Sequence, residues 1–223
     1  MPVFDWPASL IPKTVTIRPP RRTVGMSGSL TDFTQAVPSI RPPFTLTMQF
    51  DAIEGFDVLA YRAIHASLEG RANMVRVPLF DVWYAATQAE IMGGMVTHSD
   101  GTAFSDGALY LTRDLSGVLV SGLQGARTIT ADFGGYGQLL QAGLYFGLGE
   151  HPYIATGVSW SGSVATIRCS PSLRKDYDAE PLRLRPTMIG RLPDDDNGAL
   201  TLEALRYGTP SIEFTEAFDE PFS

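Results

Sequence analysis

Hydrophobic and polar residues alternate without exception from residue 44 to residue 50. Phe44, Leu46, Met48 and Phe50 are separated by two threonines and a glutamine. Side chains of a β-strand point alternately to its two faces, so this period of two predicts a strand with one buried face. Residues 14–18 show a similar alternation and predict a further strand.

The hydrophobic spacing becomes helical after Ile53. One stripe of the predicted helix carries Phe56, Leu59, Ala60, Ala63, Ile64, Ser67 and Leu68. The opposite stripe carries Asp57, Arg62, His65 and Glu69. This amphipathic pattern predicts a helix whose first stripe faces the core. Beyond Gly70, residues 74–80 return to an extended aliphatic pattern.

Short strand-like segments recur at regular spacing in the second half of the chain. They cover residues 109–112, 117–120, 126–130, 144–148, 153–158 and 164–169. Glycine-bearing turns separate most of them, which is typical of a small antiparallel barrel or sandwich. We expect this module to span residues 99–185.

Residues 186–192, 200–207 and 211–218 return to the pattern of the first strands. The first domain is therefore predicted to be discontinuous, with residues 1–98 and 186–223 flanking the inserted module. The expected fold class is mainly β: a β-sandwich with one flanking α-helix, plus the inserted barrel or sandwich.

Residues 19–43 form a long excursion bracketed by two Pro-Pro pairs. An excursion of this length within a compact domain is usually functional or disordered. The bracketing prolines favour a protruding hairpin. Its apolar residues, which indicate that it packs on something, are Val24, Met26, Leu30, Phe33, Val37 and Ile40.

Charge is distributed unevenly along the chain, which has a formal net charge of −7. The basic residues near the start are Lys13, Arg18, Arg21, Arg22 and Arg41, with Asp32 as the one acid among them. The last 38 residues hold Asp194, Asp195, Asp196, Glu203, Glu213, Glu216, Asp219 and Glu220. Two readings remain open: two solvated faces, or opposite charges that meet within one chain or between copies. The negative total argues against a domain that binds nucleic acid through its phosphates.

Residue types that carry chemistry are present, but not in catalytic or metal-binding patterns. His65, His98 and His151 have no metal-ligand spacing. Residues 194–198 lack the ligand spacing of a calcium loop and predict an acidic hairpin turn. Cys169 alternates with apolar neighbours, so we expect a buried small hydrophobe rather than a reactive thiol.

The glycine-rich segments also lack a catalytic signature. Residues 134–137 are not followed by the Lys-Ser pair of a phosphate loop, and residues 157–162 lack the spacing of a nucleophile elbow. A pair of carboxylates for glycoside hydrolysis stays open, because any two acids could approach in space. We expect no cofactor and no catalytic residue, and hence no enzyme. With no signal segment and no apolar run of about 20 residues, synthesis in a reducing cytoplasm is expected.

Taken together, these segments resemble the distal tail proteins, or closely related minor tail proteins, of long-tailed bacteriophages and gene transfer agents. The matching segments are residues 6–12 (WPASLIP), 68–72 (LEGRA), 75–78 (VRVP), 140–149 (LQAGLYFGLG), 171–174 (PSLR) and 207–218 (YGTPSIEFTEAF). They cover most of the chain as pattern and texture, without a catalytic signature.

The resemblance implies a tail-tube-like β-sandwich that assembles as a hexameric ring at the virion tail tip. Its partners would be the tail tube protein and the baseplate hub protein, with the tape measure protein and side fibres as further candidates. DNA would pass through the lumen without specific binding, and no membrane is involved. The excursion at residues 19–43 would be the stacking or inter-subunit hairpin. The candidate inter-subunit residues are Arg18, Arg21, Arg22, Met26, Phe33, Arg41, Glu213 and Glu216.

Two other functions are considered. A carbohydrate- or receptor-binding module could use the aromatic residues of the insert, although packing of a small barrel accounts for them as well. These residues are Tyr110, Tyr136, Tyr145, Tyr153 and Trp160. A cell-wall hydrolase would need an active site without any recognisable motif.

Overall fold

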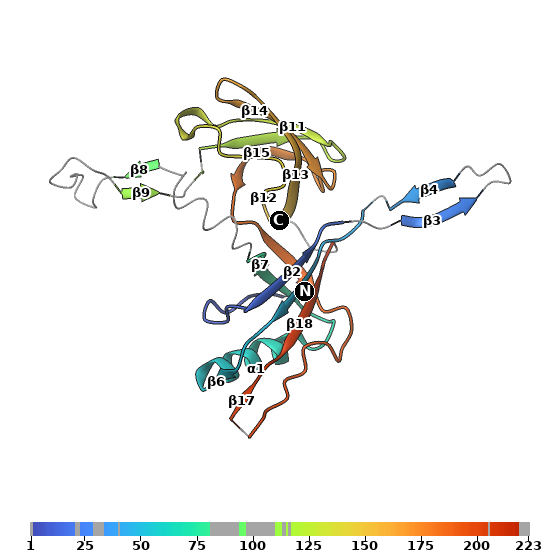
Figure 1. The fold of residues 1–223 in the computed structure, drawn as a ribbon, viewed down its shortest axis with the longest axis vertical. Helices are drawn as coiled ribbons and strands as arrows, with labels where there is room; N and C mark the ends of the chain where they lie inside the picture. The colour runs from blue at the N-terminus through green and yellow to red at the C-terminus, as the bar shows by residue number, and fades with distance from the viewer. Residues whose placement is uncertain are drawn as a thin grey trace. The chain divides into compact units, whose positions relative to one another are not determined.

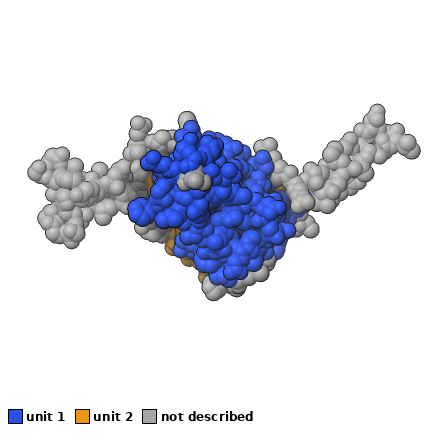
Figure 2. All heavy atoms as spheres, turned by 90° about the horizontal axis from the view of Figure 1, so that it is seen from below, with its two compact units in different colours: residues 1–80, 187–223 blue, residues 81–186 orange. Residues whose placement is uncertain are grey.

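The computed structural model describes residues 2–20, 23–28, 34–39, 41–80, 94–96, 110–112, 115, 117–204 and 206–218. Over these residues the protein is mainly β with one α-helix, which confirms this part of the predicted fold class (Figure 1). Residues 1–80 and 187–223 form unit 1, and residues 81–186 form unit 2 (Figure 2). The boundary expected between residues 98 and 99 lies outside the described residues.

Unit 1 is built on a six-stranded sheet in the order β1-β7-β16-β18-β5-β2. The strands are β1 (Val3–Asp5), β2 (Thr14–Arg18), β5 (Thr45–Gln49), β7 (Met74–Pro78), β16 (Thr187–Arg191) and β18 (Ser211–Glu216). The β1–β7 pair is parallel, and the other neighbours are antiparallel. Two strands from the end of the chain therefore occupy the middle of the sheet.

The two faces of the sheet differ in polarity along β5 and β18. Leu46 and Met48 are buried and lie opposite Phe214 and Ile212. The intervening residues of both strands are threonine, serine, glutamine or glutamate, and they form a polar face with Thr14, Thr16 and Arg18 of β2. The strict alternation of the sequence thus corresponds to one buried and one polar face.

Helix α1 (Phe56–Leu68) buries Val58, Tyr61, Ile64 and Leu68. The predicted apolar stripe is therefore wrong in part, because Phe56 is 88% exposed and Leu59 is 57% exposed. The Tyr61 ring packs edge-on against Phe50, with the ring centroids 5.8 Å apart. A large aromatic residue outside the predicted stripe thus decides which arc of the helix faces the core.

The end of α1 is fixed by two successive left-handed residues, Glu69 (φ 48°) and Gly70 (φ 65°). Asn73 Nδ2 donates a hydrogen bond to the Ser67 carbonyl oxygen at 2.9 Å, which satisfies one of the last helical carbonyls. A Cβ atom at position 70 would lie 2.6 Å from Asp195 Oδ1. Glycine is therefore required here both by φ and by the close approach of Asp195.

The strand expected at residues 200–207 is largely absent from the described part of this segment, residues 200–204 and 206–207. These residues form a bridge between Glu203 and Tyr207, and Tyr207 begins the two-residue strand β17 (Tyr207–Gly208), which pairs with β6 (Ile53–Glu54). Leu200 and Leu202 are half-buried. Leu200 and Leu202 alternate with polar residues because they pack against the rest of unit 1, and not because they belong to a sheet.

Unit 2 contains a six-strand barrel with the strand order β10-β15-β12-β13-β14-β11. The strands are β10 (Leu119–Gly122), β11 (Thr128–Asp132), β12 (Tyr145–Leu148), β13 (His151–Ser161), β14 (Val164–Ser170) and β15 (Tyr177–Arg183). Phe133, Phe146, Tyr153 and Ile167 belong to the buried cluster of this unit. Alternate residues of the short strands fill the interior, as expected for a small barrel.

Strand β15 was not predicted from the sequence. It contains Pro181, which lacks a backbone donor and is unusual in an interior strand. Ala179 has a positive φ of 50°, and the β10–β15 register shifts between Val120 and Gly122. These irregularities accommodate the proline and remove the alternating pattern.

Two further pairs of strands form separate two-stranded sheets. In unit 1, β3 (Thr23–Gly28) pairs with β4 (Thr34–Pro38), with Met26 opposite Ala36. In unit 2, β8 (Gly94–Val96) pairs with β9 (Tyr110–Thr112). The β3–β4 pair falls within the excursion that the prolines indicated.

Candidate interaction surface

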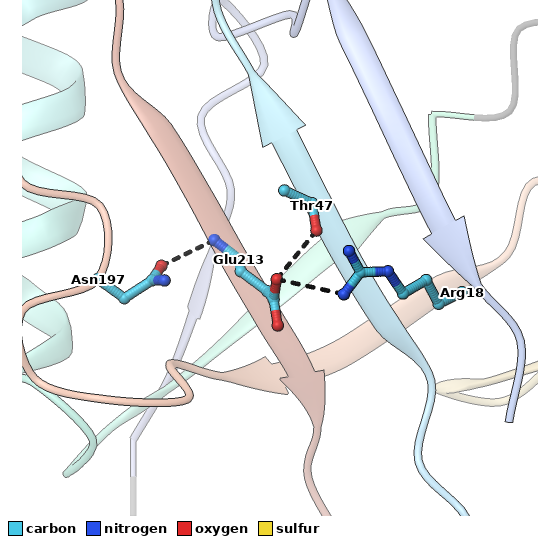
Figure 3. A network of polar contacts seen from close by, with 4 residues as sticks. All are labelled: Arg18, Thr47, Asn197 and Glu213. Carbon is cyan, nitrogen blue, oxygen red and sulfur yellow. Dashed lines mark hydrogen bonds and ion pairs between the residues drawn. The ribbon is translucent and has the colours of Figure 1, made fainter. Parts of the chain in front are cut away.

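Arg18 and Glu213 meet on the polar face of the sheet in unit 1 (Figure 3). Arg18 Nη1 lies 3.8 Å from Glu213 Oε2, and Thr47 Oγ1 donates a hydrogen bond to the same oxygen at 3.1 Å. The Arg18 side chain is 64% exposed and that of Glu213 is 29% exposed. For this pair, the basic and acidic segments thus meet within one chain. Such an exposed pair contributes at most about 1 kcal/mol.

The other predicted contact residues are placed differently. Glu216 is buried, and its carboxylate accepts a hydrogen bond from the Phe44 backbone N–H at 3.0 Å. Arg41 is exposed. Met26 lies in β3, whose side chains are not described. Arg21, Arg22 and Phe33 lie outside the described residues.

Strands β1 and β2 are the two edges of the six-stranded sheet, and each pairs on one side only within the described residues. The β2 sequence, Thr-Val-Thr-Ile-Arg, has no proline and a single charged residue at its end. Natural proteins usually protect such edges with proline, charge or a covering element. Among the described residues, no strand pairs with the outer edge of β2.

The direction of the backbone groups on this edge follows from the register. The Glu213 N–H points away from β5, because it donates to Asn197 Oδ1 at 2.8 Å. Glu213 is aligned with Thr47, and Thr47 with Thr16. Successive residues of a strand point their backbone N–H and C=O groups to alternate sides. The backbone groups of Thr47 therefore point toward β2 and those of Thr16 toward β5. The backbone groups of Val15 point to the outer edge of β2.

A groove of about 590 Å³ lies beside the first half of α1. It is lined by Glu54, Gly55, Val58, Arg62, Leu202 and Arg206. The Arg206 guanidinium lies 3.8 Å from the Glu54 carboxylate, and both side chains are largely exposed. The apolar side chains that line the groove are thus Val58 and Leu202, and the charged ones are two arginines and one glutamate.

The acidic turn at residues 194–198 makes hydrogen bonds both to α1 and the residues just after it and to strand β18 of the sheet. Asp195 Oδ1 accepts a hydrogen bond from the Arg71 N–H at 3.1 Å, and the Asn197 carbonyl is 2.9 Å from His65 Nε2. The Tyr61 hydroxyl donates to the Gly198 carbonyl at 2.8 Å, and burial raises the pKa of Tyr61. The described residues contain no group of three or more His, Cys, Asp and Glu side chains that could hold a metal ion.

The aromatic residues of unit 2 serve mainly its core. Tyr153 is fully buried, with its hydroxyl 2.9 Å from that of Tyr177. Trp160 packs edge-on against Phe133 at a centroid distance of 5.0 Å, and Tyr136 also packs against the core. Tyr145 is half-buried, and the side chain of Tyr110 lies outside the described residues. No observation on these residues favours a carbohydrate platform.

Cys169 is 4% exposed in the barrel core. Burial raises the pKa of its thiol to about 11. Since the thiolate is the nucleophile, a thiol with this pKa is a poor one at neutral pH. The expectation of a buried small hydrophobe is confirmed.

Neither a protein-family model nor a curated protein matches this sequence. Among the described residues, no helix combines the length and hydrophobicity that crossing a membrane requires.

The groove beside α1 was not predicted from the sequence. The sequence does show apolar residues on two arcs of this helix: Phe56 and Leu59 on one arc, and Val58 and Tyr61 on the other. A helix that packs on one side needs only one apolar arc. The extra arc indicates a second contact, but its location depends on Leu202 and Arg206, which are distant in sequence.

Proposed function

We propose that this protein is a structural subunit of a hexameric ring at the distal end of a long phage tail. The ring would join the tail tube protein to the baseplate hub protein, with the tape measure protein and side fibres as further partners. Two facts support the proposal: the sequence resemblance, and a six-stranded sheet whose edge strands β1 and β2 differ and each pair on one side only among the described residues.

The unpaired edges carry the proposal because a closed ring needs two different complementary surfaces on each subunit. Edge β2 offers the backbone groups of Val15 and Ile17, and edge β1 lies at the other end of the same sheet. Pairing between the β2 edge of one copy and the β1 edge of the next would extend the sheet from subunit to subunit. In this proposal, the sheet with α1 is the tail-tube-like part.

The β3–β4 pair supports a second contact between copies. A two-stranded hairpin without further packing is marginally stable in water. β3 and β4 pair only with each other within the described residues. In the proposed ring, residues 19–43 form an inter-subunit hairpin that gains stability from a neighbouring copy.

The polar face of the sheet is compatible with a lumen that passes DNA. It carries mostly hydroxyl side chains, and Arg18 is paired with Glu213. The net charge of −7 gives little attraction to phosphate, so DNA would move through without specific binding. The proposed role is structural rather than enzymatic, at the tip of the virion tail.

Light scattering over a range of protein concentrations tests the proposal. We expect the wild-type mass to approach six subunits at high concentration. Val15→Pro removes a backbone donor at the open edge and should remain monomeric, whereas Val15→Thr keeps that donor and should assemble. A wild-type protein that stays monomeric at high concentration and is absent from virions by mass spectrometry would contradict the proposal.

A further inference from the structure

The groove beside α1 has an apolar surface next to it that the subunit does not use. Phe56 is 88% exposed and Leu59 is 57% exposed, and they lie one helical turn apart. Val58 lies between them in sequence and lines the groove. Exposed apolar residues that cluster beside a groove mark a docking site more often than scattered ones do.

The rim of the groove carries positive charge. Its three ionisable side chains are those of Arg62, Arg206 and Glu54, two cations and one anion. Within the part of the chain that the structure describes, Arg62 makes no ion pair, and Arg206 has only the exposed contact with Glu54. Arginine binds carboxylates with two parallel hydrogen bonds, so this rim fits an acidic segment.

Residues 219–223 have the matching chemistry. Their sequence, Asp-Glu-Pro-Phe-Ser, places two carboxylates directly before a proline and an aromatic ring. The carboxylates fit the two arginines, and Phe222 fits the apolar surface of Phe56 and Leu59. Proline fixes φ at about −65°, so a proline at position 221 lowers the entropic cost of docking.

A subunit cannot place this segment in its own groove. Strand β18 runs away from the groove: Ser211 lies just after β17, which pairs with β6, whereas Phe218 lies beyond the far end of the strand. Six strand residues span about 17 Å. Five extended residues reach about 17 Å at most, and they would have to turn back and pass the whole strand.

We infer that the groove beside α1 receives residues 219–223 of a second copy of this chain. The contact joins two different surfaces, so it is head-to-tail and can continue from copy to copy. The inference rests on the proposed self-assembly and names a surface for it that is separate from the sheet edges.

Fluorescence anisotropy tests the docking directly with a labelled peptide of residues 217–223 and the full-length protein. We expect saturable binding that Arg62→Glu with Arg206→Glu weakens at least tenfold. Arg127→Glu with Arg168→Glu, which changes two exposed arginines in unit 2, is the charge-matched control and should bind normally. A peptide with Phe222→Ala should also bind more weakly. Wild-type-like binding by the Arg62→Glu, Arg206→Glu variant would overturn the inference.

Light scattering on the same variants separates this inference from the ring proposal. We expect Arg62→Glu with Arg206→Glu to impair assembly, and Asp219→Arg with Glu220→Arg in the same chain to restore it. Assembly that is unchanged by the groove variant would overturn the docking and leave the ring proposal intact. Groove-dependent peptide binding with a wild-type protein that associates into dimers or open chains, but never into six-subunit particles, would support the docking and contradict the ring.

Discussion

The side-chain oxygen of Asn197 accepts a hydrogen bond from the backbone N–H of Glu213 at 2.8 Å. Strand β16 pairs with β18 at Gly190 and Arg191 and then leaves the sheet. Beyond that point, an amide side chain takes the place of a neighbouring strand. The acidic turn at residues 194–198 thus supplies a hydrogen-bond acceptor to β18 beyond the point where β16 stops pairing with this strand.

Asn197→Ala should lower the free energy of unfolding by about 1–3 kcal/mol, because it leaves the Glu213 N–H without its acceptor. Asn197→Asp keeps the acceptor oxygen and should cost less. The urea midpoint of each variant measures the effect, and hydrogen exchange at the Glu213 amide locates it. Equal midpoints for the alanine and aspartate variants would show that this hydrogen bond does not stabilise unit 1.

Gly198→Ala should be more destabilising than Gly125→Ala, although both glycines have similar backbone angles (φ 84° and 86°). A Cβ at position 198 would lie 2.8 Å from Ile212 side-chain atoms, whereas nothing lies within 4 Å of one at position 125. The cost of a left-handed alanine is about 1 kcal/mol in both cases. The clash adds to it only at Gly198, and differential scanning calorimetry measures the difference.

Leu68→Ala should destabilise unit 1 by about 2–5 kcal/mol, because Leu68 is fully buried. Leu59→Ala should change the free energy of unfolding by less than about 0.5 kcal/mol, because the side chain is 57% exposed. Chemical unfolding of the two variants compares the arcs of α1. A large loss for Leu59→Ala in the monomer would contradict the orientation of the helix.

Cys169 should resist alkylation by iodoacetamide in the folded protein at pH 8. A pKa of about 11 leaves about one thiol in a thousand ionised at this pH, and the core also excludes the reagent. The folded state holds this proton more tightly than the unfolded state. The resulting stabilisation is full below the unfolded-state pKa and is lost as the pH rises toward about 11. Rapid alkylation at pH 8 without urea would contradict this prediction.

The regular parts of the fold were readable from sequence because each is half-buried. In strands β2 and β5 every second residue is more exposed than its neighbours, which leaves an unambiguous period of two. Strand β15 was missed because Pro181 and the kink at Ala179 break that period. The buried arc of α1 was misassigned because contact between Tyr61 and Phe50 depends on tertiary packing.

The candidate surface was predictable only in part. Charge along the chain indicated that Arg18 and Glu213 belong to segments of opposite sign, and the structure brings them to 3.8 Å. The sequence did not distinguish a pair within a chain from one between chains. The groove beside α1 combines residues 54–62 with residues 202–206. Local patterns carry no information on such distant pairs.

The central position of β16 and β18 has a consequence for synthesis on the ribosome. Before residues 187–218 emerge, the six-stranded sheet of unit 1 consists of two separate strand pairs, β1 with β7 and β2 with β5. Each pair would then expose an additional open edge in the nascent chain. The barrel strands β10–β15 are all translated before β16 and β18 can join these two strand pairs. A ribosome that stops between residues 183 and 187 therefore releases a fragment with all six barrel strands and an incomplete, aggregation-prone sheet, so the complete sheet forms only in chains translated beyond the last strand.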